Sequence, residues 1–591
     1  MMKPVRLFRI IRVRLLVFIF LSIFVLSGSE LLITNVKSSF SSKDSDRVIN
    51  SDIMENSCTT VIVGKDASID GSVLTTHTAD CHVCDFRLIY VPAKDHKSNE
   101  MRPVFRFKKE YPRIVSAERS LDYAPCKGQK PEIIGYIPEV EHTYAYFDAV
   151  YGVMNECQLA IGESTAAAKT RAKPKPEGQA LFDVAELTRV ALERCKTARE
   201  AIKLMGRLAV EYGYYGWGEN LTVIDPDEAW VFEILATPDG TSAIWVAQRV
   251  PDDEVAVLPN IFTIREVNTD SPDFMFSDNI FSVAEEQGWW NSGGSFDFLK
   301  TYSPGEYVHS YYALRRKWRA YDLLAPSKKF DPWVKDVYTK EYPFSVKPDK
   351  KVSVQDLFRI HRDYYEGTEF DLTKGFAAGP FGTPNRYAGG RGERLLPGAW
   401  ERAISIFRCS YSFVIQARNW LPDPIGGVVW WGPDAPHTTC YVPFYAGTTG
   451  LPEEYSTGSL YKFTRESAWW AFDFVSNWAD LKFNYMIEDI KVKQKKIENK
   501  EFAMQPAIDQ AAQMMYKTNP DLAREYLTSY CIKNAEDVVK EWWELSDFLI
   551  TKYNDGYINF PELGKGAGYP FWWLKAVGYD KGPTQYKKPE K

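Results

Sequence analysis

Several features that indicate particular protein classes are missing from this sequence. Lys and Arg total 72 against 78 Asp and Glu, a net charge of −6, so no basic excess suggests a nucleic-acid partner. No internal repeat is evident. The pair Cys81 and Cys84 has CxxC spacing, but no second CxxC and no His-x-His pair accompanies it to complete a zinc site. We therefore expect neither a bound metal nor a cofactor, and Cys81 and Cys84 are either a local disulfide or two unrelated thiols.

The N-terminus carries a targeting signal. Basic residues from Lys3 to Arg14 precede an apolar run from Leu15 to Leu26 that only Ser22 interrupts, and small residues follow. This pattern predicts a secretory signal peptide over residues 1–29, or an uncleaved membrane anchor if the apolar stretch extends further. Residues 30–57 are rich in Ser and Asp, which suits a pro-segment. We expect export to a secreted, periplasmic or lumenal location, with membrane contact only through this segment before processing.

The remaining chain is long enough for a large core. It contains 591 residues, 45% of them hydrophobic. Residues 151–162 and 218–234 read as β-hairpins, and 181–212 carry helical apolar periodicity. From about residue 465 to 550 the pattern becomes helical and charged. We expect an α+β domain over 58–450 and a helical C-terminal region over 451–591.

Cysteine usage draws attention to residue 58. The chain has nine cysteines, so at least one stays unpaired if all bonds are internal. Cys58 opens the β-branched run Cys-Thr-Thr-Val-Ile-Val directly after the predicted pro-segment. Cys58 is either a buried thiol in an edge strand or the first residue of the working protein.

Six stretches carry a resemblance to a known family. They are residues 58–80, "YGVMNECQLAIGEST" (151–165), "LERCKTAREAI" (192–202), "GENLTVIDPDEAWVFEI" (218–234), "WVAQRVPDDEVAVLPNIFTI" (245–264) and "SYSFVIQARNWLPDPIGGVVWWG" (410–432). In this order they resemble the C69 dipeptidase family, relatives of secernins within the N-terminal-nucleophile hydrolases. The resemblance spans residues 58–450. It implies a four-layer αββα sandwich and hydrolysis of a peptide amide bond.

The chemistry of an N-terminal cysteine agrees with this resemblance. A thiol is only partly ionised near neutral pH and needs a nearby base. Cleavage after Ser57 would give Cys58 a free α-amine, with a reference pKa of about 7.7–8.0, which can take the thiol proton. Cys58 would then carry its own base. A pro-segment that blocks this amine explains why the first strand begins at the thiol.

The resemblance also implies further site residues. Related enzymes commonly carry Arg, a two-residue gap and Asp, where this chain has His77 and Asp80. Asp80 would hold the Cys58 ammonium or orient the thiol. His77 departs from the arginine form, and it is either a titrating site residue or a surface or half-buried strand residue. Asn155 and Asn260 match asparagines that would donate to the oxyanion, and turn formation is the alternative for each.

We therefore expect an exported, autoprocessed cysteine dipeptidase that hydrolyses dipeptides or short peptides. The alternatives are an acylase-type amidase acting on non-peptide amides, and an inactive, secreted or membrane-tethered secernin-like interaction protein. Retention of Cys58, Asp80 and Asn155 together argues against the inactive form. An oligomer is compatible with the sequence.

Overall fold

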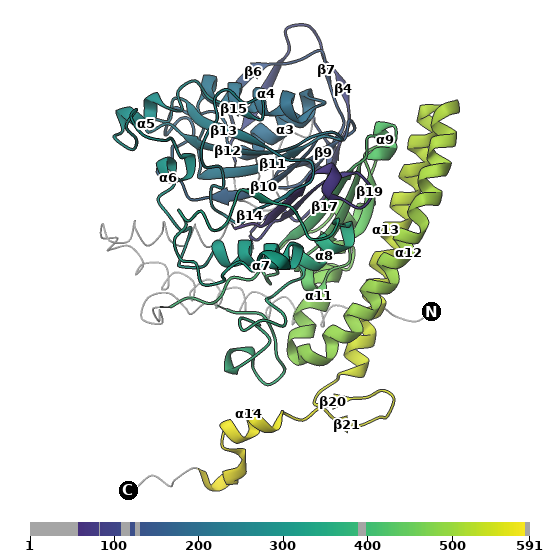
Figure 1. The fold of residues 1–591 in the computed structure, drawn as a ribbon. Coiled ribbons are helices and arrows are strands. Elements are labelled where there is room, and N and C mark those ends of the chain that lie inside the picture. Colours follow the sequence, from purple (N-terminus) through teal and green to yellow (C-terminus); the bar gives the residue numbers. More distant parts are fainter. Residues whose placement is uncertain (1–56, 82, 108–118, 124–129, 388–397, 586–591) are drawn as a thin grey trace, which may run out of the picture. The chain divides into compact units, whose positions relative to one another are not determined.

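The computed structural model describes residues 57–81, 83–107, 119–123, 130–387 and 398–585 (Figure 1). They all fall within one compact unit, Glu55–Lys591. The predicted signal peptide and all of the predicted pro-segment except Ser57 lie outside the described residues. Among the described helices, none combines the length and the apolar character needed to cross a membrane.

The first large sheet holds the strand that follows Cys58. Its seven antiparallel strands are rich in β-branched and aromatic residues, as in "TVIV" and "YSFVIQA". β1 lies between β14 and β2 and is an interior strand, so Cys58 does not begin an edge strand. In spatial order the strands are β16 (Ser345–Val346), β14 (Val255–Leu258), β1 (Thr60–Val63), β2 (Val73–Thr78), β17 (Tyr411–Ala417), β18 (Val428–Pro433) and β19 (Val442–Tyr445).

The second large sheet has eight antiparallel strands. Both predicted hairpins lie in it, as β9–β10 and β11–β12. In spatial order the strands are β15 (Phe274–Phe276), β13 (Ala243–Val250), β12 (Ala229–Ala236), β11 (Gly218–Ile224), β10 (Ala160–Ala166), β9 (Gly152–Asn155), β8 (Tyr146–Asp148) and β3 (Ile89–Val91).

The two sheets contact each other through β1 and β2 on one side and β10 and β11 on the other. The approach is closest at Gly162, where a Cβ atom would lie 2.4 Å from the Thr76 carbonyl oxygen. Hydroxyls pair across this contact: Thr75 Oγ1 lies 2.5 Å from Thr222 Oγ1, and Thr60 Oγ1 donates to the Glu163 carbonyl at 2.8 Å. This packing brings the start of β1 next to the end of β10.

Helices contact both sheets. α3 and α4 pack on strands of the eight-stranded sheet, whereas α7 and α8 pack on strands of the seven-stranded sheet. α4 begins with a capping box formed by Thr197 and Glu200 and ends at Gly213, whose φ is 79°. Up to residue 456, the α-helices in the described part of the chain are α3 (Val184–Arg194), α4 (Ala198–Tyr212), α5 (Ser282–Glu286), α6 (Phe298–Tyr302), α7 (Leu314–Leu324), α8 (Val354–His361), α9 (Asp423–Gly426) and α10 (Glu453–Ser456).

The C-terminal region is helical and packs on strands of the seven-stranded sheet. α13 contacts β19 and also packs along α12 and α11 (Figure 1). The helices beyond the predicted boundary at residue 450 therefore belong to the same compact unit as both sheets. They are α11 (Ala468–Ala479), α12 (Phe483–Thr518), α13 (Pro520–Lys552) and α14 (Phe571–Ala576). Three two-stranded sheets complete the fold: β4 (Lys94–Asp95) with β7 (His142–Thr143), β5 (Met101–Phe105) with β6 (Ile133–Pro138), and β20 (Tyr557–Ile558) with β21 (Lys565–Gly566).

The CxxC pair forms a disulfide between Cys81 and Cys84, just beyond the end of β2. The other cysteines within the described residues are free thiols: Cys58, Cys157, Cys195, Cys409, Cys440 and Cys531.

Candidate functional site

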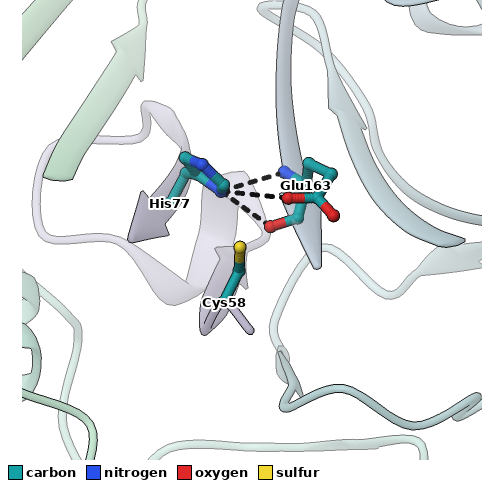
Figure 2. A group of neighbouring side chains, drawn as sticks. All are labelled: Cys58, His77 and Glu163. Atoms are coloured by element: carbon teal, nitrogen blue, oxygen red, sulfur yellow. Dashed lines mark hydrogen bonds and ion pairs between the residues drawn. The ribbon is translucent and has the colours of Figure 1, made fainter. Parts of the chain in front are cut away.

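Cys58 lies in the interior at the start of β1, with a side chain only 3% exposed. The Cys58 sulfur lies within 4.8 Å of a ring nitrogen of His77 and of a carboxylate oxygen of Glu163 (Figure 2). His77 comes from β2 and Glu163 from β10, so each large sheet contributes to this group. The contact between the sheets thus places an imidazole and a carboxylate beside the thiol.

His77 is tied to Glu163 through its Nδ1 atom. This atom lies 2.7 Å from the Glu163 carbonyl oxygen, 3.3 Å from its backbone nitrogen and 4.0 Å from its Oε2. The side chain is 1% exposed, so the alternative of a surface or half-buried strand residue is wrong. Burial lowers the pKa of His77 despite the neighbouring Glu163 carboxylate, and the imidazole is therefore neutral near pH 7.

The surroundings of Cys58 disfavour its thiolate. Burial raises the pKa of the thiol well above its usual range, and the Glu163 and Asp80 carboxylates raise it further. The Glu163 carboxylate lies within 4.8 Å of the Cys58 sulfur, while the Asp80 backbone acts in the opposite direction on the pKa of the thiol. In the chain that still carries Ser57, Cys58 is therefore a neutral thiol with a carboxylate at hand to accept its proton.

Cysteine, histidine and glutamate are also metal-ligand types. Cys58, His77 and Glu163 are the one group in the described part of the chain whose donor atoms lie close enough together to hold an ion. Here the His77 Nδ1 atom is engaged with the Glu163 backbone, whereas its Nε2 atom has no hydrogen-bond partner. A metal bound through Nδ1 would have to displace the contact with the Glu163 backbone.

Asp80 is fully buried beyond the end of β2, and its charge partner is Arg402. Asp80 Oδ2 also accepts a hydrogen bond from Thr78 Oγ1 at 3.0 Å. Arg402 Nη2 in turn lies 3.3 Å from the Ser57 carbonyl oxygen and 3.4 Å from Ser57 Oγ. Asp80 thus connects, through one arginine, to the peptide bond that precedes Cys58.

A second arginine contacts Ser57. Arg408 Nη2 donates to Ser57 Oγ at 2.8 Å and to the Tyr312 hydroxyl at 3.2 Å. Burial alone would raise the pKa of Tyr312, but Arg408, Arg402 and Arg316 together lower it to about 8. The residue before Cys58 is therefore enclosed by positive charge.

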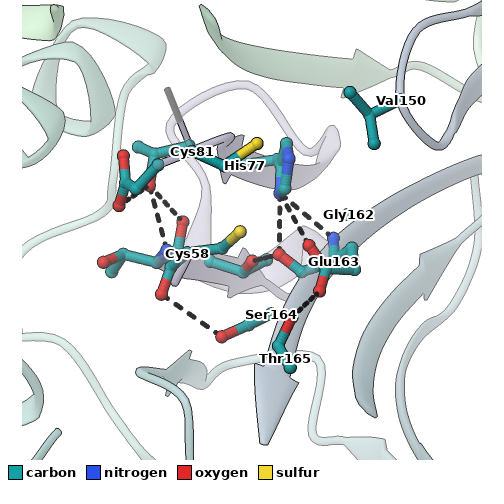
Figure 3. Close-up of polar contacts among 12 residues, drawn as sticks. Cys58, His77, Cys81, Val150, Gly162, Glu163, Ser164 and Thr165 are labelled. Atoms are coloured by element: carbon teal, nitrogen blue, oxygen red, sulfur yellow. Dashed lines mark hydrogen bonds and ion pairs between the residues drawn. The ribbon is translucent and has the colours of Figure 1, made fainter. Parts of the chain in front are cut away.

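Asn260 is linked to Cys58 indirectly. Its Oδ1 accepts from Arg316 Nη2 at 2.7 Å, and Arg316 Nη1 donates to the Cys58 carbonyl at 2.8 Å. Ser164 Oγ donates to the same carbonyl at 3.3 Å (Figure 3). The Asn260 amide nitrogen donates to the Thr165 carbonyl at 2.7 Å, and its backbone is left-handed, with φ of 70°. In this geometry Asn260 positions Cys58 rather than presenting a free donor to an oxyanion.

Asn155 is not part of this group. Its amide nitrogen donates to the carbonyls of Leu192 and Cys195 at the end of α3, at 2.9 and 2.8 Å. Its Oδ1 accepts from the backbone nitrogens of Cys157 and Leu159. Both amide hydrogens are used, so the geometry corrects the oxyanion interpretation: Asn155 closes a hairpin and ties it to a helix.

Three site residues were missed by reasoning from the sequence: Glu163, Arg316 and Arg402. Glu163 had a detectable signal, because it is a carboxylate inside a strand of small and apolar residues, "AIGESTA". Arg316 had a weaker one, because it lies among the buried positions of α7. Arg402 precedes β17 in a segment without helix or strand and had none.

Known proteins are similar to this chain over most of its length. The model of peptidase family C69 matches residues 57–496. A probable dipeptidase from Latilactobacillus sakei is 27% identical over 429 residues, which cover 70% of this chain and 79% of that protein. A probable dipeptidase B from Streptococcus pyogenes serotype M1 is 25% identical over 426 residues (71% and 78%), and a probable dipeptidase from Salmonella dublin is 25% identical over 406 residues (66% and 81%). Because the family match covers more than half of the chain and begins one residue before Cys58, this chain belongs to peptidase family C69.

Proposed function

We propose that this C69 peptidase is a cysteine dipeptidase that removes its own pro-segment and then cleaves dipeptides or short peptides with Cys58. The observation that carries the proposal is the buried Cys58 thiol, which lies within 4.8 Å of the Glu163 carboxylate and is preceded by a peptide carbonyl that contacts Arg402. The names of the relatives support a dipeptide substrate.

The contacts of Ser57 support self-cleavage as the route of maturation. The thiol transfers its proton to the Glu163 carboxylate, and Sγ attacks the Ser57 carbonyl carbon, forming a thioester as the carbon–nitrogen bond to Cys58 breaks. The released nitrogen takes up the proton, and water hydrolyses the thioester, which restores the thiol. Arg402, 3.3 Å from the carbonyl oxygen, is placed to stabilise the negative charge that forms there.

The mature enzyme would use the new α-amine of Cys58 as its base. The amine takes the thiol proton, the thiolate attacks the substrate carbonyl, and the proton then passes to the leaving amine. Water hydrolyses the resulting thioester. Cleavage also adds a titratable positive charge beside the thiol, which opposes the effect of Glu163 and Asp80 on the thiol pKa.

The proposal includes the fold and the location. Two sheets in contact, with α3 and α4 on one and α7 and α8 on the other, are compatible with the four-layer αββα arrangement of N-terminal-nucleophile hydrolases. We also propose export through residues 1–29, on the basis of their sequence pattern.

The test is to measure the mass of the purified active chain together with its hydrolysis of Ala-Ala. We expect the active chain to begin at Cys58. Cys58→Ala should stay uncut and inactive, while Cys58→Ser should process slowly, because a hydroxyl ionises far less readily than a thiol.

The matched control is Cys157→Ala, which removes a half-buried thiol in the β9–β10 turn. This variant should process normally, hydrolyse Ala-Ala and lose activity to a thiol alkylator as the parent does. An active chain that retains Ser57, or activity in Cys58→Ala, would disprove the proposed mechanism.

A further inference from the structure

A second carboxyl group lies beside Glu163. β10 and β11 pair Thr165 with Glu219 and Glu163 with Leu221, so Glu163 and Glu219 occupy the same face of neighbouring strands. Burial, together with the neighbouring Glu163 carboxylate, raises the pKa of Glu219 well above its usual range. We call Glu163 and Glu219 the carboxyl pair. The proposed steps of self-cleavage and turnover assign no positively charged group to this pair.

This carboxyl pair has no cationic partner in the described part of the chain. Glu163 is fully buried and Glu219 is 5% exposed, yet no Lys or Arg there forms an ion pair with either. One oxygen of each, Oε2, also lacks a hydrogen-bond partner. Buried carboxyl groups without compensation are costly and concentrate at functional sites.

The pair lies close to the reacting atom. An oxygen of Glu163 is within 4.8 Å of Cys58 Sγ. Cys58, Glu163 and Glu219 all raise the pKa values of Tyr151 and Tyr307, so both tyrosines lie near all three groups. A cation bound by the pair would therefore be close to the bond that Cys58 attacks.

A dipeptide brings such a cation to this distance. Its α-ammonium nitrogen is about 2.5 Å from the scissile carbonyl carbon, because one Cα separates them. Sulfur approaches that carbon to about 3–3.5 Å before attack. The ammonium must then lie within about 6 Å of Sγ, which is within reach of the Glu163 carboxylate.

We propose that Glu163 and Glu219 bind the free α-ammonium of the substrate's first residue, so that the enzyme requires an unblocked N-terminus. This inference rests on the proposed peptidase function. The Cys58 α-amine does not fill the same role, because it must be neutral when it accepts the thiol proton. A neutral acyl group would leave the buried pair uncompensated, so the inference favours peptides over the substrates of an acylase.

The experiment compares two substrates of nearly identical shape on the matured enzyme. Ala-Ala carries the α-ammonium, whereas lactyl-alanine has a hydroxyl in its place. We expect kcat/KM to favour Ala-Ala by about 100-fold or more, because a buried polar site discriminates strongly against an analogue that lacks its partner. In Glu219→Gln this preference should fall by about tenfold or more.

The matched control is Glu233→Gln. Glu233 is also buried, but it pairs with Asn220 and so lies on the opposite face of the sheet. A glutamine there can still accept hydrogen bonds from the Thr263 and Ile264 backbone nitrogens. This variant should keep the parent's preference for Ala-Ala.

The outcomes separate the inference from the function on which it rests. Equal kcat/KM for the two substrates in the parent enzyme would overturn the inference without using any variant. An unchanged preference in a folded Glu219→Gln enzyme, verified by its melting temperature, would do the same. If the processed parent cleaves neither substrate, the dipeptidase proposal itself fails.

Discussion

Asp80 has two tasks in this structure, because its carboxylate neutralises Arg402 and lies beside the thiol. Arg402 is 3% exposed, and its guanidinium contacts the carbonyl that precedes Cys58. Loss of one member of a buried ion pair leaves the other charge uncompensated in a poorly solvated site. Asp80 therefore contributes to both stability and reaction, whereas a turn residue would contribute only to stability.

Asp80→Asn should lower the free energy of unfolding by about 3 kcal/mol, since it removes the partner of a buried arginine. Self-cleavage and hydrolysis of Ala-Ala should slow by roughly tenfold to 100-fold, because Arg402 loses the contact that fixes its position. Urea unfolding measures the first effect, and cleavage kinetics with kcat/KM measure the second.

The control for Asp80 is Asp363→Asn, which breaks another buried pair, between Asp363 and Arg319. We expect a similar loss of stability with normal processing and kcat/KM. If Asp80→Asn matches this control in both measurements, Asp80 is only structural.

Residues near Cys58 in sequence were predictable, and their distant partners were not. Cys58, His77 and Asp80 lie in or next to the opening strand pair of β1 and β2. The structure brings Cys58 and His77 together, and Asp80 reaches the Ser57 carbonyl through Arg402. Arg402 lies 322 positions from Asp80, and only the pairing of β2 with β17 brings its segment near. A single sequence carries no local pattern for such a contact.

At the scale of elements, Asn155 decides how the β9–β10 hairpin is attached. Its four hydrogen bonds close the turn and hold it to the end of α3. Asn155→Ala should therefore lower the free energy of unfolding by about 3 kcal/mol, at roughly 1 kcal/mol for each of several lost bonds. The kcat/KM of the folded fraction should stay within about threefold of the parent, because an oxyanion donor would cost about 100-fold or more.

Asn155→Asp serves as the comparison, since it keeps the acceptor but replaces the two donors with a carboxylate oxygen. Its stability should be no higher than that of Asn155→Ala, because this buried oxygen would face the Leu192 and Cys195 carbonyls. A 100-fold loss of kcat/KM in a stably folded Asn155 variant would restore the oxyanion interpretation.

The elements that local patterns predicted were the hairpins and the helical C-terminal region. The hairpin predicted over residues 218–234 turns at Asp225, whose carboxylate accepts from the backbone nitrogens of Asp227 and Glu228. The periodic stretch 181–212 forms two helices, α3 and α4, because the chain turns at Cys195 and Thr197 caps a new helix. The helical spacing of apolar residues continues across the turn between α3 and α4, so the sequence pattern alone did not predict this turn.

At the scale of the whole molecule, the sequence predicts an α+β chain but not how its parts pack. Strand order depends on pairings such as β1 with β14 and β2 with β17, which join distant segments. The close approach at Gly162 and the attachment of α13 to β19 likewise join distant parts. These contacts form only when the complete chain folds, so no short stretch of the sequence predicts them.

Stability at acid pH should depend on histidines buried throughout this interior, and His361 in α8 gives the sharpest case. Burial, with His77 and Arg362 adding to it, lowers the pKa of His361 to about 3, whereas the unfolded chain has an ordinary value of about 6.5. Between these values the unfolded chain binds more protons, so this contribution to stability is complete above about pH 6.5 and is lost as the pH falls toward 3.

His361→Asn should therefore destabilise the protein at neutral pH, and its deficit relative to the parent should shrink in acid. The difference in unfolding free energy should decrease by about 1.4 kcal/mol per pH unit below about pH 6.5, or by about 2 kcal/mol between pH 7 and pH 5. Urea unfolding of both proteins at the two pH values measures this, with His142→Asn at an exposed site as the reference. A deficit that stays constant would mean that His361 takes up its proton without unfolding, and that the interior around α8 admits a charge.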